Sequence, residues 1–382
     1  MRRNPVLTGL GPSPIAALHE RARDLAAEGP LVDFSVGDPD EPTPPVAREA
    51  LLGSVGPSSS YPVAAGTAEA RRAVADYVAR RFGREVDADR HVVITAGSKE
   101  AVFHLPMVVS GPDPGAVVLH PTPGYAVYGR AASLAGLTPR VYRLAGDFEV
   151  DADLLARSGW DDVVLAWVNS PHNPAGTVVD RAELARIVEA AASAGAWLAS
   201  DECYVDVHDP GDPSPASVLD VADDDLTGVV SLLSTSKRDG MTGYRVGAMV
   251  GDARLVESMR VLKQVAGTVP PEFVQSAAAA AWADDAHVAH RNEVFAAKRA
   301  ALAAAFEAAG YPVVGSRAGL YLWVRVGDDV EVADRLLERR IVVSPGRVFG
   351  PGGEGHVRLA LVPSVAECER AGEEIRACLT EH

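Results

Sequence analysis

The chain has 382 residues and a formal net charge of −16 at pH 7, so it is long enough to bury a large core and we expect two domains. The acidic balance argues against nucleic acid or an anionic membrane surface as a partner. No apolar run approaches the roughly 18 residues of a membrane span, and no apolar segment follows the basic N-terminal residues as in a signal peptide. The cysteines form no C-x-x-C pair, which predicts a reducing, cytoplasmic location: Cys203, Cys368 and Cys378.

The first part of the chain predicts a helix, a short strand and a loop. Ile15–Glu28 has the spacing of an amphipathic helix, and Leu31–Val36 that of a short strand. The following segment, Gly37–Pro45, is so rich in proline that no regular element can hold it. Ser60–Gly66 then precedes a helix over Thr67–Arg81.

From His91 onward, strands and helices alternate. This rhythm predicts a mainly parallel sheet with helices on both faces. Ligands of such sheets bind beyond the carboxyl ends of the strands, where loops meet helix N-termini. The expected strands are 91–95, 116–120, 140–144, 163–168, 197–200, 229–233 and 248–250, and the helices are 99–109, 125–134 and 180–194.

Two of the strand ends carry candidates for binding a flat, phosphorylated ligand. Gly97 lets a strand turn into a helix, so the backbone N–H groups of Ser98 and Lys99 would face a phosphate. An ordinary capped helix start explains the same residues equally well. Tyr125 follows the next strand, where an aromatic ring either stacks on a flat ligand or packs in the core.

Asp201 follows a strand that is apolar on both sides. An unpaired buried carboxylate costs several kcal/mol, so it should face a cation. The alternative is a surface carboxylate.

Lys237 lies on a Ser- and Gly-rich turn between two apolar runs, in S-T-S-K-R-D-G-M-T-G-Y-R-V-G. The hydroxyls of Ser234 and Ser236, together with the guanidinium of Arg245, make a site for a dianionic phosphate. A lysine beside a phosphate site suggests a Schiff base to pyridoxal phosphate. A solvated lysine on a turn is the alternative.

Beyond the lysine segment the pattern changes to that of a small α+β domain. We predict a division into an N-terminal segment, 1–45, that completes the small domain, a large domain, 46–285, and the small domain itself, 286–382. Expected helices are 253–265, 271–283, 287–309, 330–339 and 365–380, and expected strands are Tyr311–Val314, 320–326, 341–344 and 356–361.

Three features of this second half need an interpretation. Arg358 lies in an apolar V-R-L-A-L strand and therefore needs an anion. His287 and His290 share a helix face, but no third ligand is evident, so we expect them to be solvated and predict no metal site. Gly350–Gly355 spells G-x-G-x-x-G but runs into a strand, so it is not a dinucleotide fingerprint.

Taken together, the motifs resemble those of the fold-type I, class I/II aminotransferases, in that family's order and over nearly the whole chain. They are G-x-P-D-x-P-T-P from Gly37, N-x-P-x-N-P-x-G from Asn169, D-E-x-Y from Asp201 and S-x-S-K-x(7)-R-x-G from Ser234. Ala175 stands where Thr is usual in the N-x-P-x-N-P-x-G motif. Ala70 stands where Leu is usual in the family's Y-x(4)-G-x(3)-L-R segment, which Tyr61 and Gly66 match. The resemblance implies an α/β fold in which a mainly parallel seven-stranded sheet lies between helices, with a small α+β domain beside it.

The resemblance also implies a role for each cofactor-binding residue. Lys237 would hold pyridoxal phosphate and move the substrate's proton, and Asp201 would pair with the pyridine nitrogen. Asn173 and Tyr204 would contact the ring hydroxyl, and Tyr125 would pack on the ring. The phosphate would be bound by Gly97, Ser98, Lys99, Ser234, Ser236 and Arg245.

Substrate and subunit contacts follow from the same resemblance. Gly37, Asn173 and Arg358 would bind the substrate, with Arg358 on its α-carboxylate. Tyr61 would reach the cofactor phosphate of the neighbouring subunit, which implies a homodimer. Amino acids and 2-oxo acids are the implied small-molecule partners.

Within the family, the motifs look most like the succinyldiaminopimelate aminotransferases, which use glutamate as donor and N-succinyl-2-amino-6-oxopimelate as acceptor. S-T-S-K departs from the more common S-L-S-K, and Arg347 is either a ligand of a distal carboxylate or a solvated loop arginine. Alternatives are a transaminase for aspartate, alanine or a natural-product amine, and a C–S lyase. A regulator on this fold would need a helix-turn-helix extension, for which Met1–Leu31 is too short.

Overall fold

The computed structural model describes residues 3–9, 16–58, 60–109, 111 and 115–380. Its centre is a seven-stranded sheet in the order β2-β8-β7-β6-β5-β3-β4. Only β8 runs antiparallel to its neighbours, so the predicted mainly parallel sheet is confirmed. The strands are β2 (Val92–Thr95), β3 (Val117–Thr122), β4 (Thr138–Arg143), β5 (Val163–Asn169), β6 (Trp197–Asp201), β7 (Val229–Ser234) and β8 (Gly247–Gly251).

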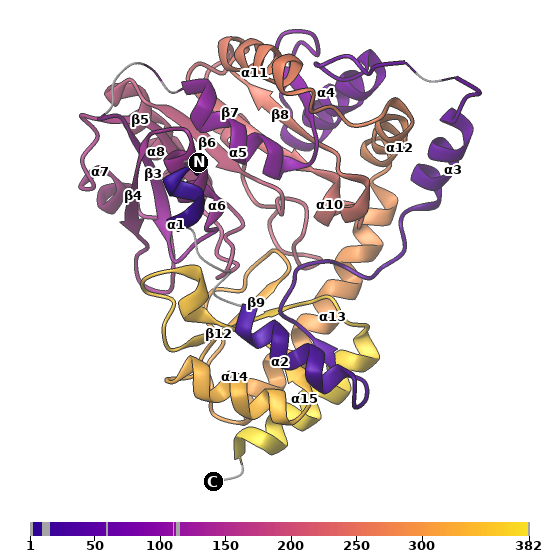
Figure 1. Cartoon of the computed structure of the whole chain (residues 1–382), viewed down its shortest axis with the longest axis vertical. Coiled ribbons are helices and arrows are strands. Elements are labelled where there is room, and N and C mark those ends of the chain that lie inside the picture. Colours follow the sequence, from indigo (N-terminus) through magenta and orange to yellow (C-terminus); the bar gives the residue numbers. More distant parts are fainter. Residues whose placement is uncertain (1–2, 10–15, 59, 110, 112–114, 381–382) are drawn as a thin grey trace.

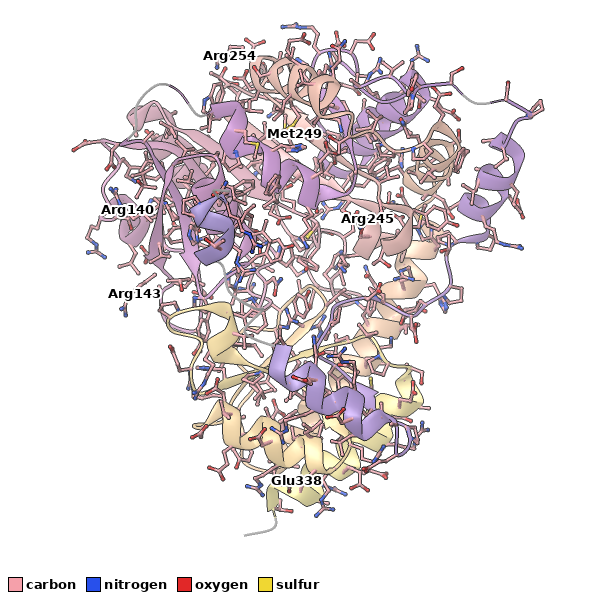
Figure 2. All side chains as sticks on the ribbon, viewed as in Figure 1. Arg140, Arg143, Arg245, Met249, Arg254 and Glu338 are labelled. Carbon is pink, nitrogen blue, oxygen red and sulfur yellow. The ribbon has the colours of Figure 1, made fainter. Side chains whose placement is uncertain are left out.

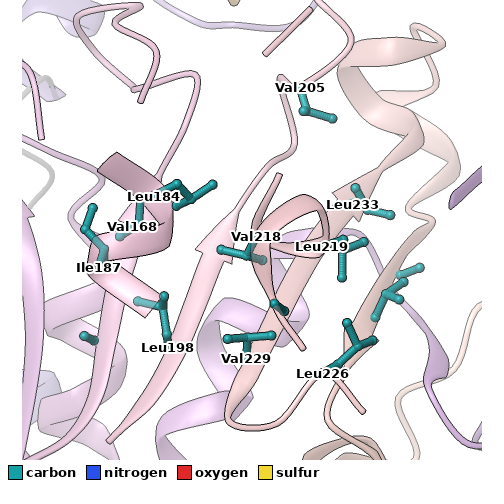
Figure 3. Packing of buried hydrophobic residues seen from close by; sticks show 14 of the residues in the cluster. Val168, Leu184, Ile187, Leu198, Val205, Val218, Leu219, Leu226, Val229 and Leu233 are labelled. Carbon is teal, nitrogen blue, oxygen red and sulfur yellow. The ribbon is translucent and has the colours of Figure 1, made fainter. Parts of the chain in front are cut away.

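Helices cover both faces of this sheet (Figure 1). One face packs against α5 (Ser98–Val109), α6 (Val127–Leu134) and α11 (Ala253–Ala266). The other face packs against α4 (Ala68–Phe82), α7 (Ala152–Ala156), α8 (Arg181–Ala194), α9 (Val218–Val221) and α12 (Glu272–Trp282). Figure 3 shows side chains of α8 and α9 against those of the central strands. Burial on both faces explains why the central strands β5 to β8 are nearly continuous apolar runs, whereas the edge strand β4 is largely exposed and carries polar residues.

The small domain is built around a three-stranded antiparallel sheet in the order β11-β12-β9. Its strands are β9 (Tyr321–Arg325), β11 (Ser344–Pro345) and β12 (His356–Ala360). The long helix α13 (Ala286–Ala308) runs from the large domain into the small one and packs there on α15 (Val365–Thr380) (Figure 1). Helix α14 (Asp329–Glu338) completes this layer.

The N-terminal segment packs on the small domain. Strand β1 (Val32–Asp33) pairs in parallel with β10 (Ile341–Val342). Ala22 of α2 (Ala16–Ala26) packs with Leu337 and Val342 in one apolar cluster. These contacts are those expected of a segment that completes the small domain, while the two predicted boundaries, after residues 45 and 285, stay a prediction.

Capping residues explain where the large-domain helices begin and end. Thr67 caps α4 by accepting a hydrogen bond from the Ala70 amide, and Asp180 caps α8 in the same way. Both helices end at a glycine with positive φ, Gly83 at 65° and Gly195 at 69°. A side chain disfavours this left-handed conformation, so these glycines are efficient helix terminators.

Three local expectations differ from the structure. Tyr311–Val314 forms no strand; only Val313 makes an isolated bridge, because the Pro312 residue inside the segment lacks an N–H donor. The lysine turn contains two short helices, α10 (Thr235–Arg238) and η1 (Thr242–Tyr244). Helices α1 (Pro5–Gly9) and α3 (Pro45–Ser54) were not predicted, and Ile15, the expected start of the first helix, lies outside the described residues.

None of the helices in the described ranges combines the length and the apolar composition needed to cross a membrane.

Candidate active site

The predicted site residues converge on one cavity of about 800 Å³. Its walls come from the carboxyl ends of the sheet strands, from β9, β11 and β12 of the small domain, and from the N-terminal loop. Twelve of the predicted residues line it: Gly37, Ser98, Lys99, Tyr125, Asn173, Asp201, Tyr204, Ser234, Ser236, Lys237, Arg245 and Arg358. The topology therefore brings together residues that are more than 300 positions apart in the sequence, Gly37 and Arg358.

Lys237 enters the cavity from α10, directly after β7. Ser234 caps this short helix, since its hydroxyl accepts a hydrogen bond of 3.1 Å from the Ser236 amide. The Lys237 ammonium donates to the carbonyl of Gly37 in the N-terminal loop. Gly37 has no room for a side chain, because a Cβ there would lie 2.5 Å from the Tyr321 hydroxyl. The loop backbone thus approaches the lysine closely.

Asp201 is a buried carboxylate at the end of β6. Its Oδ2 accepts a hydrogen bond of 2.8 Å from Tyr128 and its Oδ1 one of 3.4 Å from the Cys203 amide. No cation from the described residues pairs with it. Burial raises its pKa. Its exposed side faces the cavity, where a bound cationic group would complete its environment.

A cradle of glycine backbone and one arginine lies beside the lysine. Arg245 donates to the carbonyls of Thr242 and Ala96, at 2.9 and 3.4 Å. Gly97 has a φ of 75°, a left-handed conformation that favours glycine, and a Cβ there would lie 2.6 Å from the Arg245 guanidinium. Ser98 starts α5, whose N-terminal amides face the same place as Arg245. Figure 2 labels Arg245, which follows η1 and is solvent-exposed in the single chain.

Arg358 and Asn173 form the wall opposite the sheet. Arg358 donates to Asn173 Oδ1 at 2.9 Å and to the Ser35 carbonyl at 2.6 Å. Its guanidinium lies 4.2 and 4.4 Å from the ring centroids of Tyr321 and Phe349. It forms no ion pair with a described residue and its Nε has no partner. Burial lowers the pKa of Arg358, so a carboxylate ligand would stabilise its charge.

Tyrosines surround the space between Lys237 and Arg358. The Tyr204 hydroxyl hydrogen-bonds that of Tyr321 at 2.9 Å. Tyr125 stands edge-on to Tyr128, with ring centroids 5.6 Å apart. Burial raises the pKa of Tyr125 and of Tyr204, so both phenols stay protonated and can donate hydrogen bonds.

Several residues that support the site were not predicted. Tyr128 hydrogen-bonds Asp201 and stacks on Trp167 at 4.9 Å. Behind the cradle, Glu100 accepts a hydrogen bond from the Ala96 amide and pairs with the buried Lys263 at 2.6 Å. The sequence signals for this pair were Lys263 in α11 and Glu100 in the first turn of α5. Nothing in the sequence indicates that these two residues contact each other.

Two charged residues, one in the small domain and one in the long helix, have partners within the chain. Arg347 does not line the cavity; its guanidinium makes hydrogen bonds of 2.7 to 3.1 Å to Asp329, so it has a carboxylate within the chain. His287 is not solvated, because it bonds Asp239 at 2.8 Å and Asp284 at 3.0 Å. The described residues contain no group of three or more side chains suited to a metal ion.

Tyr61 lies outside the cavity, and it is 99% exposed in the single chain. Its predicted contact across a subunit interface stays a prediction.

These residues fit pyridoxal phosphate. A buried carboxylate without a counter-ion suits a pyridinium, and the glycine and arginine cradle suits a phosphate. The cavity also offers an amine for the aldehyde and an arginine for a substrate carboxylate.

Comparison with known proteins agrees with this assignment of the cavity to pyridoxal phosphate. The family described as "Aminotransferase class I and II" matches residues 29–375. Among curated relatives, the 4-dedimethylamino-4-oxo-anhydrotetracycline transaminase OxyQ of Streptomyces rimosus is 36% identical, covering 89% of this chain and 91% of its own. The LL-diaminopimelate aminotransferase of Desulforudis audaxviator is 34% identical, covering 98% and 97%.

A solved structure of a probable N-succinyldiaminopimelate aminotransferase from Thermus thermophilus superposes with a TM-score of 0.87 at 28% identity, covering 95% of this chain and 99% of that one. The chain therefore belongs to the class I and II aminotransferases of fold type I and is a pyridoxal-phosphate-dependent transaminase.

Proposed function

We propose that this aminotransferase moves an amino group from glutamate to a 2-oxo acid of the keto-pimelate type, with N-succinyl-2-amino-6-oxopimelate as the acceptor. The observation that carries the proposal is Arg358, a buried guanidinium that faces Lys237 across the cavity and has no carboxylate partner among the described residues. A guanidinium in this state binds a carboxylate in a bidentate pair. The diaminopimelate aminotransferase among the relatives supports the acceptor class.

Each protein residue has a defined task in this reaction. The bound cofactor supplies a ring that delocalises the electron pair left when the substrate Cα–H bond breaks. Asp201 keeps the ring nitrogen protonated, because a buried carboxylate favours a cation beside it. Arg358 holds the α-carboxylate and thereby orients the Cα–H bond towards Lys237. The amine of Lys237 would accept the Cα proton and hold it at Nζ.

The donor is tested by mixing the cofactor-loaded enzyme with glutamate alone. We expect about one 2-oxoglutarate per subunit and no ammonia, and subsequent addition of N-succinyl-2-amino-6-oxopimelate should restart turnover. Free 2-amino-6-oxopimelate, oxaloacetate and pyruvate complete the acceptor panel. Release of pyruvate and ammonia from a cysteine conjugate, with no product from glutamate, would identify a C–S lyase instead.

The role of Arg358 has its own test. Arg358→Lys keeps the charge but loses the bidentate geometry, so we expect kcat/KM for every amino acid to fall by roughly 100-fold. Arg347→Lys is the matched control, because Arg347 already has a carboxylate partner outside the cavity. Equal effects of the two substitutions would contradict the assignment.

A second candidate is transamination of a bulky natural-product ketone, favoured by the tetracycline transaminase among the relatives. The same acceptor panel distinguishes it, since such an enzyme would turn over a polycyclic ketone and leave keto-pimelates unused.

We also propose a homodimer in which Tyr61 contacts the cofactor phosphate of the partner subunit. Tyr61 belongs to a set of apolar side chains that are more than half exposed in the single chain, together with Leu52, Val55 and Val63. Exposed apolar side chains concentrated in one part of a chain are typical of subunit interfaces.

Mixed dimers test this arrangement. Lys237→Ala and Tyr61→Ala subunits, each impaired alone, should regain activity when they are exchanged, because one site per mixed dimer is intact. If Tyr61 served its own subunit, exchange would restore nothing.

The three free thiols agree with the predicted cytoplasmic location, which fractionation of the native host would test.

A further inference from the structure

The cavity contains more positive charge than the proposed reaction uses. Five lysine or arginine side chains line the cavity, together with two carboxylates: Lys99, Arg130, Lys237, Arg245 and Arg358, with Asp38 and Asp201. The cofactor and the α-carboxylate account for Lys237, Arg245, Arg358 and Asp201. Lys99, Arg130 and Asp38 are left over.

Two of the remaining three have partners within the chain. Asp38 accepts a hydrogen bond from the Thr242 hydroxyl. The Lys99 ammonium lies 5.8 Å from the ring centroid of Tyr125, in cation–π geometry. Arg130, in contrast, makes no side-chain hydrogen bond, ion pair or ring contact with the described part of the chain.

The position of Arg130 on α6 directs its side chain to the cavity. Ala126 and Arg130 are four residues apart at the start of this helix, so they lie on one face, and both line the cavity. Helical side chains lean towards the helix N-terminus, which here carries Tyr125. Arg130 therefore lines the cavity on the same helix face as Ala126, close to Tyr125.

Arg130 is also only partly exposed, and it forms part of the cavity lining. A guanidinium that is partly removed from water and has no counter-ion binds a carboxylate strongly, with two parallel hydrogen bonds. The sequence offered Arg347 for a distal carboxylate, but Asp329 occupies that guanidinium.

We propose that Arg130 binds the second, distal carboxylate of a dicarboxylic substrate and so determines the enzyme's preference for diacids. The inference rests on the proposed function and adds the residue that recognises the substrate's far end. Arg358 of the small domain then holds the α-carboxylate, and Arg130 of the large domain holds the distal one. A diacid therefore forms an ion pair with each domain, whereas a neutral amino acid of the same length forms one only with Arg358.

The test compares donors of matched length in single-turnover release of the 2-oxo acid. Aspartate, glutamate and 2-aminoadipate are each paired with a neutral amino acid of similar chain length, such as norleucine for glutamate. The variants are Arg130→Met, Arg130→Lys and the control Arg347→Met. We expect Arg130→Met to lower kcat/KM for the preferred diacid about tenfold or more, through KM, and to change the neutral partner less than about twofold.

Arg130→Lys should recover part of the preference, since it restores the charge without the fork. Arg347→Met should keep the wild-type ratio. An unchanged diacid-to-neutral ratio in Arg130→Met, or equal losses for both donors, would overturn the inference. A wild-type enzyme that prefers the neutral donor in every pair would overturn it too.

The same experiment distinguishes a failure of the proposed function from a failure of the inference about Arg130. If the wild-type enzyme uses aspartate or 2-aminoadipate but not glutamate, the proposed donor is wrong, and the ratio for the diacid it does use still tests Arg130. Loss of that ratio in Arg130→Met then supports the inference, and its persistence contradicts it.

Discussion

Charged groups that line the cavity differ from those buried just behind it. Behind the wall, Lys263 is neutralised by Glu100 and Arg238 by Asp206, the latter at 2.9 Å. In the cavity, Asp201 and Arg358 are equally buried but have no ionic partner among the described residues. A buried charge without a partner is costly in a folded chain. The difference indicates where ligands, rather than side chains, complete the electrostatics.

Two adjacent carboxylates sharpen this comparison most. Glu202 accepts hydrogen bonds from Ser217, Ser231 and the Val218 amide, whereas Asp201 faces the cavity. Asp201→Asn should lower kcat roughly 10³-fold, or about 4 kcal/mol in activation free energy, without destabilising the cofactor-free protein. Glu202→Gln should instead lower the melting temperature. Kinetics and thermal unfolding of both variants check this; a destabilised Asp201→Asn apoprotein would contradict it.

Breaking the ion pair between Lys263 and Glu100, which lies behind the cavity lining, should lower both stability and cofactor affinity. Although burial opposes it, the His104 side chain, 3.4 Å away, and the charge of Lys263 hold the pKa of Glu100 below its ordinary value. Lys263→Met would leave this carboxylate buried and unpaired, which costs about 3 kcal/mol of unfolding free energy. Because Glu100 also holds the Ala96 amide, cofactor affinity should fall as well.

Denaturant unfolding and cofactor titration measure these two effects. The double variant Glu100→Gln/Lys263→Met is the control, since it removes both charges and should recover part of the stability. A double variant no more stable than Lys263→Met would contradict the ion-pair account.

A buried histidine beside the site gives a pH prediction. Burial lowers the pKa of His172 to about 4, below the roughly 6.5 of an unfolded chain. The unfolded state therefore binds the proton first, and stability is lost as pH falls from about 6.5 towards 4. At pH 5 the loss should be about 2 kcal/mol relative to pH 7.5.

Unfolding of the wild type and of His172→Gln at both pH values checks this. The variant should lose about 2 kcal/mol less on acidification. Identical pH dependence of the two proteins would contradict the assignment to His172.

The smallest effect is expected at Arg347. Its side chain is 49% accessible, but the carboxylate of Asp329 is fully buried and also accepts a hydrogen bond of 2.9 Å from the Arg347 amide. Arg347→Lys keeps a positive charge beside this carboxylate, so it should cost less than about 1 kcal/mol and leave substrate selectivity unchanged. Chemical denaturation and the donor ratio measure both. A large change in selectivity would place this residue in the substrate site after all.

Much of the site followed from local sequence because its residues lie at strand ends. Asp201 and Lys237 each follow a buried apolar run, and the sheet brings such ends together. Arg358 was predictable as an arginine within an apolar strand.

The residues that were missed depend on contacts between distant segments. Tyr128 meets Asp201 across 73 positions, and Glu100 meets Lys263 across 163. The sequence left the role of Arg347 open, because its partner Asp329 lies in a different element, 18 positions earlier. No local pattern reports which of several charged residues will be paired, since that depends on tertiary packing.

The central claim is that Lys237 carries the cofactor. It is tested most directly by reducing the cofactor-loaded enzyme with borohydride, which fixes the bond between an amine and the cofactor aldehyde, and by locating the label in the digested chain by mass spectrometry. We predict the label on Lys237 alone, and none in Lys237→Ala. A label on Lys99 or Lys263, or an unlabelled wild-type chain that is nevertheless active, would contradict the account.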